Sequence, residues 1–138
     1  MFKRILLATD GSPIVERMLT YAVHLARVEP ATVIVLHIYE PPEHYAQLPG
    51  YNHLLKQYRT VAQAVIDDAM RALEVDGVQV QGELRTGDAA EAIIAASKAY
   101  DVDLILLGTR GRSNIAAMLG SVSNTVLRSV SCPALIVL

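Results

Sequence analysis

The sequence has 138 residues and is 52% hydrophobic, which is enough apolar material for the two-sided core of one ordinary domain. Twelve basic and fourteen acidic residues give a formal net charge of −2, so no overall positive charge attracts nucleic acid or anionic lipid. The single cysteine excludes an intrachain disulfide, the first residues lack a signal-peptide pattern, and no apolar run is long enough to cross a bilayer. We therefore expect one domain over residues 1–138, located in the cytoplasm, that binds neither nucleic acid nor membranes.

Short apolar runs mark the expected strands. Residues 5–8, 32–36, 104–107 and 134–138 are almost continuously apolar, which is typical of parallel strands that are covered on both faces. Residues 78–84 instead alternate between apolar and polar side chains, so one face of that strand should be wetter. We expect this fifth strand at an edge of the sheet.

Apolar side chains at helical spacing lie between these runs. The first predicted helix opens at Pro13, whose missing N–H suits a first turn. Residues 40–50 are irregular, and we interpret them as a long loop of the kind that often serves as a lid. A longer helix follows and ends before Gly77. Its predicted inward stripe contains Leu54, Tyr58, Val61, Val65, Ala69 and Leu73.

Two further helices complete the pattern. Asp88, with Glu91 three residues later, is an Asp-led variant of the capping box and predicts a helix start. The last helix carries Ser121 and an inward-facing Val126, and Pro133 is predicted to end it. The strict alternation of strands and helices predicts an α/β fold: an open, five-stranded parallel sheet with right-handed crossovers and helices on both faces.

The carboxyl ends of the strands carry the residues that we expect to form a ligand site, because ligands bind there in open parallel sheets. Asp10 follows the first strand, where it either accepts a hydrogen bond from a ribose hydroxyl or simply caps the first helix. Gly108 and Gly111 allow the backbone to approach a ligand closely. Gly120 and Ser121 offer free N–H groups, a hydroxyl and the positive end of a helix dipole to phosphate.

Four segments along the chain together match one family pattern: residues 3–12, the strand end at 36–38, the glycines at 108, 111 and 120 with Ser121, and residues 132–137. Over essentially its whole length the chain resembles the universal stress protein family. The resemblance implies a Rossmann-like sheet of the adenine nucleotide alpha hydrolase-like type, with strand order 3-2-1-4-5. It also implies a regulatory protein of the stress response that binds adenine nucleotides.

The resemblance further implies the role of each site residue. Ala8 and Asp10 would lie at the adenine and ribose, and Ile38 would offer backbone groups to the base. Gly108 would line the ribose and first phosphate, and Gly120 would help to hold the remaining phosphates. The implied ligand is ATP, ADP or AMP, with Mg²⁺ allowed beside the phosphates. The full implied set is Ala8, Thr9, Asp10, Ile38, Leu107, Gly108, Arg110, Gly111, Arg112, Gly120, Ser121, Val122 and Ser123.

One spacing departs from the family signature. The signature has nine residues between the second glycine and Gly-Ser, whereas residues 112–119 of this chain number eight. We expect contacts to the outer phosphates to be affected first, so AMP or ADP should tolerate the change better than ATP. The alternative is that the crevice is empty, and that the protein is a dimeric interaction module of the same family that binds no nucleotide.

The catalytic motifs that we sought are missing from the sequence. The turn after the first strand lacks both the P-loop and the Gly-x-Gly-x-x-Gly fingerprint, and the Gly-x-Ser-x-Gly elbow is absent. We therefore expect no catalytic residue and at most weak ATP hydrolysis. The histidines lack metal-site spacing, so no metal site is predicted. We interpret His37 as structural and Cys132 as a small buried apolar residue.

The last strand, at residues 134–138, is apolar and lies at the sheet edge by family likeness. An exposed edge of this kind invites pairing with another chain. Members of the family commonly dimerise through this strand, so the resemblance predicts a homodimer through residues 134–138.

Overall fold

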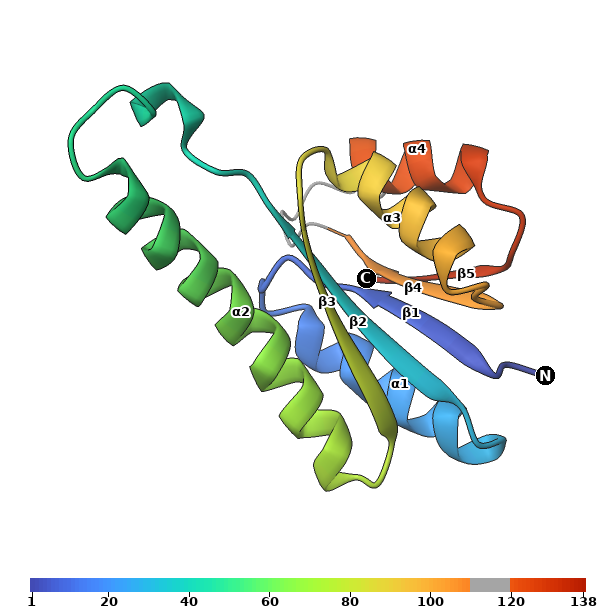
Figure 1. Cartoon of the computed structure of the whole chain (residues 1–138). Coiled ribbons are helices and arrows are strands. Elements are labelled where there is room, and N and C mark those ends of the chain that lie inside the picture. The colour runs from blue at the N-terminus through green and yellow to red at the C-terminus, as the bar shows by residue number, and fades with distance from the viewer. Residues whose placement is uncertain (110–119) are drawn as a thin grey trace.

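The computed structural model describes residues 1–109 and 120–138, and a sheet of five parallel strands lies at its centre. Their order across the sheet is β3-β2-β1-β4-β5 (Figure 1), which confirms the predicted α/β class and strand order. The strand predicted to lie at a wetter edge is β3, which is an edge strand with several exposed residues. The strands are β1 (Arg4–Ala8), β2 (Thr32–Tyr39), β3 (Gln79–Thr86), β4 (Leu104–Gly108) and β5 (Ala134–Val137).

Helices cover both faces of the sheet. On one face lie α1 (Val15–Val28) and α2 (Tyr51–Val75), and on the other lie α3 (Ala89–Ala99) and α4 (Ser121–Ser129) (Figure 1). In β1, Ile5 and Leu7 belong to the core beneath α1 and α2, whereas Leu6 belongs to the core beneath α3 and α4. All three are completely buried. Burial on both faces explains why the runs are continuously apolar rather than alternating.

The helix ends agree with the sequence in part. The N–H of Glu91 donates to the Asp88 carboxylate at 2.9 Å, so the predicted Asp cap of α3 is confirmed. Pro13 lies in a turn just before α1, because the Glu16 N–H reaches only to the Pro13 carbonyl, which is a tighter turn than an α-helix makes. The prediction that Pro133 ends the last helix is wrong, since α4 ends at Ser129 and Val130 is already extended.

The long segment between β2 and α2 contains a short 3₁₀ helix, η1 (Glu43–Tyr45), and then leads into α2. The first turns of α2 and the η1 segment project past the carboxyl ends of the strands (Figure 1). The predicted inward stripe of α2 is therefore only partly correct. Val61 is 68% exposed, and its neighbour Ala62 is buried instead, because a small residue lies where the helix first meets the sheet.

The contact between α2 and the edge strand is tight at Gly82. A Cβ atom built on Gly82 would lie 2.7 Å from Met70 Sδ and 2.8 Å from Ile66 Cγ2. Ile66 is completely buried and β-branched, so it has little freedom to move away. The absence of a side chain at Gly82 therefore fixes how closely α2 packs on β3.

Replacing Gly82 by valine should force α2 away from β3. We expect the free energy of unfolding to fall by about 1–3 kcal/mol, which is the usual range for overpacking. Urea unfolding followed by circular dichroism measures the change. Gln81→Val on the same strand is the control, because Gln81 is exposed. An unchanged unfolding midpoint for Gly82→Val would contradict the packing argument.

Candidate functional site

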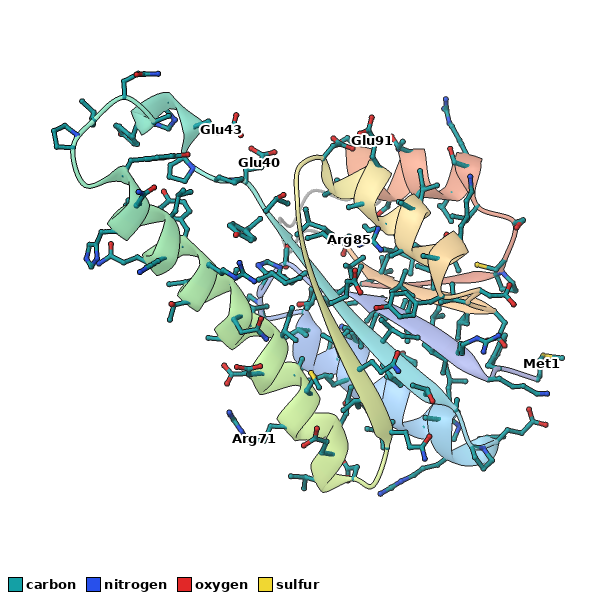
Figure 2. All side chains as sticks on the ribbon, in the orientation of Figure 1. Met1, Glu40, Glu43, Arg71, Arg85 and Glu91 are labelled. Carbon is teal, nitrogen blue, oxygen red and sulfur yellow. The ribbon has the colours of Figure 1, made fainter. Side chains whose placement is uncertain are left out.

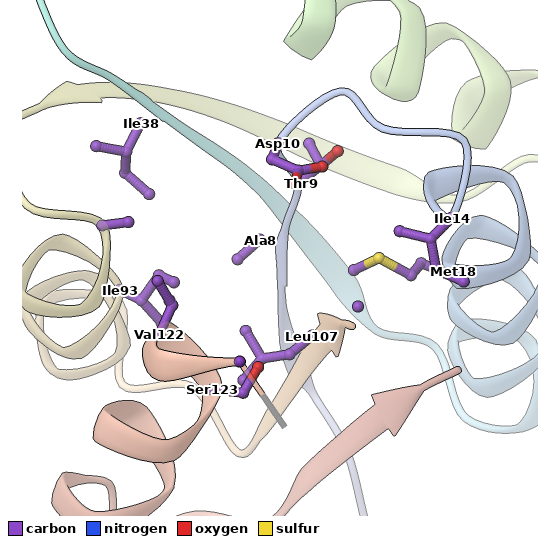
Figure 3. A pocket seen from close by; sticks show the side chains of 13 residues that line it. Ala8, Thr9, Asp10, Ile14, Met18, Ile38, Ile93, Leu107, Val122 and Ser123 are labelled. Atoms are coloured by element: carbon purple, nitrogen blue, oxygen red, sulfur yellow. The ribbon is translucent and has the colours of Figure 1, made fainter. Parts of the chain in front are cut away.

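A hollow lies at the carboxyl ends of β1, β2 and β4, among the first residues of the helices that follow (Figure 3). It occupies the place where the strand order reverses on the two sides of β1, because β2 lies on one side and β4 on the other. The described residues enclose about 100 Å³. They are Ala8, Thr9, Asp10, Ile14, Met18, Ile38, Ala89, Ile93, Leu107, Gly108, Gly120, Val122 and Ser123.

Most of the residues predicted from the sequence line this hollow. Ser121 does not line it, and is exposed in the first turn of α4. Arg110, Gly111 and Arg112 lie outside the described residues, so their predicted roles stay predictions. The predicted residues that line the hollow are Ala8, Thr9, Asp10, Ile38, Leu107, Gly108, Gly120, Val122 and Ser123.

The sequence analysis missed four apolar residues of the hollow. Ile14 and Met18 of the α1 region lie on one side, and Ile93 of α3 lies on the other, with Ala8 between them (Figure 3). Ala89, the first residue of α3, is the fourth. Ile14 precedes the first residue of α1 and Ala89 is the first residue of α3, so both lie at the start of a helix that follows a strand, and that position was the available signal. Their helical spacing and apolar character favoured a purely structural interpretation.

Gly108 leaves room on the α1 side of the hollow. A Cβ atom at this position would lie 2.8 Å from Ile14 Cγ2 and 3.0 Å from Met18 Sδ. The glycine therefore lets the end of β4 pass close to α1. The sequence analysis expected Gly108 to approach a ligand, and that role stays a prediction, because the close neighbours in the structure are Ile14 and Met18 of the same chain.

Local hydrogen bonds shape the turn after β1. The Ser12 N–H donates to Asp10 Oδ1 at 2.9 Å, and the Gly11 N–H donates to Thr9 Oγ1 at 3.1 Å. Gly11 has a φ of +80°, which a residue with a side chain rarely adopts. Part of the capping role considered for Asp10 is thus present in the structure. Its role at a ribose stays a prediction.

His37 joins the end of β2 to the same turn. Its Nδ1 lies 2.7 Å from the Thr9 carbonyl oxygen, and since a carbonyl only accepts, Nδ1 carries the proton. The imidazole is 8% exposed. The contact confirms the structural interpretation of His37, and it holds a residue that lines the hollow.

Replacing His37 by leucine should leave the Thr9 carbonyl without this donor. We expect a loss of about 1–3 kcal/mol in the free energy of unfolding, the range for a buried polar group that loses its partner. His37→Asn is the matched control, because its amide nitrogen can donate from nearly the same place and should recover part of the loss. Urea unfolding of the two variants makes the comparison. Equal stability of the Leu and Asn variants would contradict the role of the hydrogen bond.

The two helices beneath the hollow begin differently. The first turn of α3 is closed by the Asp88 carboxylate, whereas Gly120 precedes α4 and supplies no side-chain cap. A Cβ atom at Gly120 would meet nothing within 4 Å. The φ of Gly120 is −65°, which any residue can adopt. Among residues 1–109 and 120–138, no side chain caps the N-terminal N–H groups of α4, which are the kind of groups that bind anions.

The described groups with shifted pKa values lie elsewhere. Burial raises the pKa of Glu83, but hydrogen bonds from Tyr100 and Arg85 outweigh it and leave this pKa below its usual value. The hydrogen bond donated to Glu83 is the main cause that raises the pKa of Tyr100. Burial raises the pKa of the Cys132 thiol, which is half-buried beside the apolar core rather than fully buried as predicted. None of the three lines the hollow.

Residues 1–109 and 120–138 contain neither a cluster of metal-ligand side chains nor a membrane-spanning helix. No group of three or more His, Cys, Asp or Glu side chains in these ranges could hold a metal ion. No helix there is both long and apolar enough to cross a membrane.

The fold and the hollow define an open α/β domain with a hollow at the carboxyl edge of a parallel sheet. The model of the universal stress protein family matches residues 1–137. The chain is 37% identical to a universal stress protein of Thermus aquaticus from the QAH/OAS sulfhydrylase 3′ region. It is 33% identical to the universal stress protein YxiE of Bacillus subtilis, and each comparison covers 99% of both chains. The chain therefore belongs to the universal stress protein family.

Solved structures agree with this assignment. MJ0577 of Methanocaldococcus jannaschii superimposes with a TM-score of 0.86 at 28% identity, over 99% of this chain and 96% of that one. A universal stress protein in complex with cAMP has a TM-score of 0.73 at 24% identity, over 99% and 96% of the two chains. One from Archaeoglobus fulgidus in complex with dAMP has a TM-score of 0.70 at 19% identity, over 99% and 98%. Because the last two identities are below 25%, those two structures support the fold alone.

Proposed function

We propose that this protein is a cytoplasmic regulator of the stress response that binds an adenine nucleotide in the hollow. The main support is convergence: the ends of β1, β2 and β4 and the uncapped start of α4 meet at one place. Two proteins of the same fold were solved with the adenine nucleotides cAMP and dAMP. The lone cysteine suits a reducing compartment.

The chemistry of the walls assigns a part of the ligand to each side. Ile38, Ile93 and Val122 are apolar and suit the faces of a purine base. Asp10 is the acidic residue of the lining, and it suits a ribose hydroxyl. The open N–H groups of α4 suit phosphate, with Ser123 beside them.

The size of the hollow and its single carboxylate limit the ligand further. The volume enclosed by the described residues is about 100 Å³. Sites that enclose drug-sized ligands usually measure about 300–1,000 Å³, so part of a mononucleotide would remain outside. We expect the outer phosphates to be that part, because the glycine spacing beside them is one residue shorter than in the family signature. Asp10 is the only carboxylate among the described lining residues, so a Mg²⁺ ion would take its ligands mainly from phosphate oxygens and water.

Replacing Gly120 by aspartate should abolish phosphate binding without unfolding the protein. The new carboxylate would cap α4 and repel a phosphate at the same N–H groups, so we expect affinity for AMP, ADP and ATP to fall by at least about tenfold. Gly120→Asn is the matched control, since it caps equally well without the charge. Isothermal titration and thermal-shift series with each nucleotide, and with adenosine as the ligand without phosphate, measure the effect.

The outcomes separate the two hypotheses about the hollow. Nucleotide binding that is lost in Gly120→Asp and retained in Gly120→Asn supports the nucleotide site. If the unaltered protein hydrolyses ATP slowly, that activity is intrinsic only if Gly120→Asp abolishes it too. No binding of any nucleotide by the unaltered protein at about millimolar ligand would contradict the proposal. It would favour the alternative, a dimeric interaction module of the same family, which the shorter glycine spacing also allows.

We propose in addition that the protein is a homodimer that pairs through residues 134–138. In β5, Ala134, Leu135 and Ile136 are only half-buried, and Leu138 is 56% exposed. The Ile105 N–H donates to the Pro133 carbonyl and the Thr109 N–H to the Val137 carbonyl. In a parallel pair this alternation directs the backbone groups of residues 134 and 136 outward, toward a second copy.

Replacing Ile136 by proline should therefore separate the dimer. The substitution removes an outward N–H group while the backbone groups that face β4 remain. Size-exclusion chromatography with light scattering should give a dimer for the unaltered protein and for Ile136→Val, and a monomer for Ile136→Pro. Circular dichroism checks that the proline variant is folded. An unaltered protein that is monomeric at micromolar concentration would refute the proposed pairing.

A further inference from the structure

We propose that the groove between α2 and the end of β2 is a second ligand site, which binds a small uncharged aromatic molecule that donates one hydrogen bond. The groove lies beside α2 and encloses about 300 Å³ (the helix and the strand are labelled in Figure 2's companion view, Figure 1). The argument for this site does not depend on nucleotide binding. The residues that line the groove are His37, Tyr39, Gln57, Tyr58, Val61 and Ala62.

The groove exists because α2 extends past the part of the sheet that it covers. The helix starts at Tyr51, but its buried residues begin only at Ala62. Tyr58 is 41% exposed and Val61 is 68% exposed. Single exposed apolar side chains are ordinary on a protein surface, but these two line a concave one. Apolar surface of this shape is typical of a site that a small molecule fills.

His37 presents an unused hydrogen-bond acceptor to the groove. Its Nδ1 donates to the Thr9 carbonyl, so in the neutral imidazole Nε2 carries a lone pair and can only accept. No described residue makes a hydrogen bond with Nε2. Among the described residues, Ser12 Oγ is the buried side-chain atom without a partner, so Nε2 is accessible rather than enclosed. Because the 8% exposed His37 lines the groove, Nε2 faces a ligand there.

The walls of the groove favour a flat and uncharged ligand. Tyr39 enters from β2 and Tyr58 from α2, and neither ring stacks on the other or on His37. A ligand ring can therefore pack against either tyrosine without breaking an existing ring contact. No Lys, Arg, Asp or Glu is among the described lining residues, so an ionic group would lose hydration without gaining a partner.

The size of the groove limits the ligand to a small molecule. Its volume of about 300 Å³ lies at the lower limit of ordinary ligand sites, which measure about 300–1,000 Å³. This suits one ring or two fused rings. A partner helix would need apolar anchor positions along several turns, whereas Tyr58 and Val61 lie within one turn of α2. A nucleotide would bring phosphate charge that no described lining residue compensates.

Phenol and its methyl ether, anisole, test the hydrogen bond, because anisole lacks the O–H donor. Each is titrated to about 10 mM into the ¹⁵N-labelled protein without nucleotide, since ligands of this size bind with about millimolar affinity. Phenol should shift the amide signals of residues 37–39 and 57–62 more than those of residues 120–123. Anisole should bind at least about fivefold more weakly, because it leaves Nε2 without a donor.

Two substitutions locate the contact. His37→Asn removes Nε2 but keeps a donor for the Thr9 carbonyl, so phenol should then bind no more tightly than anisole. Tyr58→Ala removes a wall of the groove and should weaken phenol binding at least about fivefold. Tyr21→Ala is its matched control, because Tyr21 is 43% exposed but lies on α1 and lines neither the groove nor the hollow. It should change the affinity less than about twofold. Circular dichroism confirms that the variants are folded.

Several results would overturn the inference. They are equal affinity for phenol and anisole, no shift of the groove signals at about 10 mM phenol, and equal effects of Tyr58→Ala and Tyr21→Ala. Shifts confined to residues 120–123 would place phenol in the hollow instead. Self-association that Tyr58→Ala abolishes would show that a second copy of the chain occupies the groove. If His37→Asn unfolds, the comparison of the two tyrosine variants still decides.

Discussion

The reversal of strand order at β1 is the constraint on which the rest of the structure depends. β1 pairs with β2 on one side and with β4 on the other. The connection from β1 to β2 runs through α1 on one face of the sheet, the connection from β3 to β4 runs through α3 on the other face, and so neither covers the end of β1. The end of β1 is therefore left open. Because Ile5, Leu6 and Leu7 are all completely buried, the strand is fixed from both faces. The hollow therefore follows from the order of the strands and does not depend on any polar side chain.

The end of β2 connects the hollow with the second, apolar groove beside α2, which Tyr58, Val61 and Ala62 line from the helix. Successive side chains of a strand point to opposite faces, so Ile38 lines the hollow while His37 and Tyr39 line the groove beside α2. His37 also donates a hydrogen bond to the carbonyl of Thr9, which itself lines the hollow. The two places thus share one strand end and one buried hydrogen bond. A ligand that shifted the β1 turn would act directly on a residue of the groove, which is the kind of physical link that coupling between two sites requires.

The features that sequence analysis predicted correctly are those set by local rules. The Asp88 cap needs only its own helix, and the order of the strands follows from a family pattern that extends over the whole chain. The errors came from tertiary packing. Val61 and Ala62 are adjacent, and only the position of the sheet decides which of them is buried. Ile14 and Met18 pack against the core, as apolar side chains at helical spacing are expected to do, but the missing side chain of Gly108 also brings them to the wall of the hollow.

The four α-helices among the described residues differ in how well the residues at their starts stabilise them. α1 and α3 have an acidic residue in the first turn, Glu16 and Glu91, as the helix dipole favours. α2 and α4 have none, and these two helices also lack a side-chain cap, as does α1. A better cap stabilises a helix by up to about 1–2 kcal/mol, so these two helix starts are less stable than the sequence could make them. The start of α4 opens on the hollow. Among the described residues no side chain compensates the positive end of this helix, which suits a group from outside the chain, and local instability at such a position is the expected consequence.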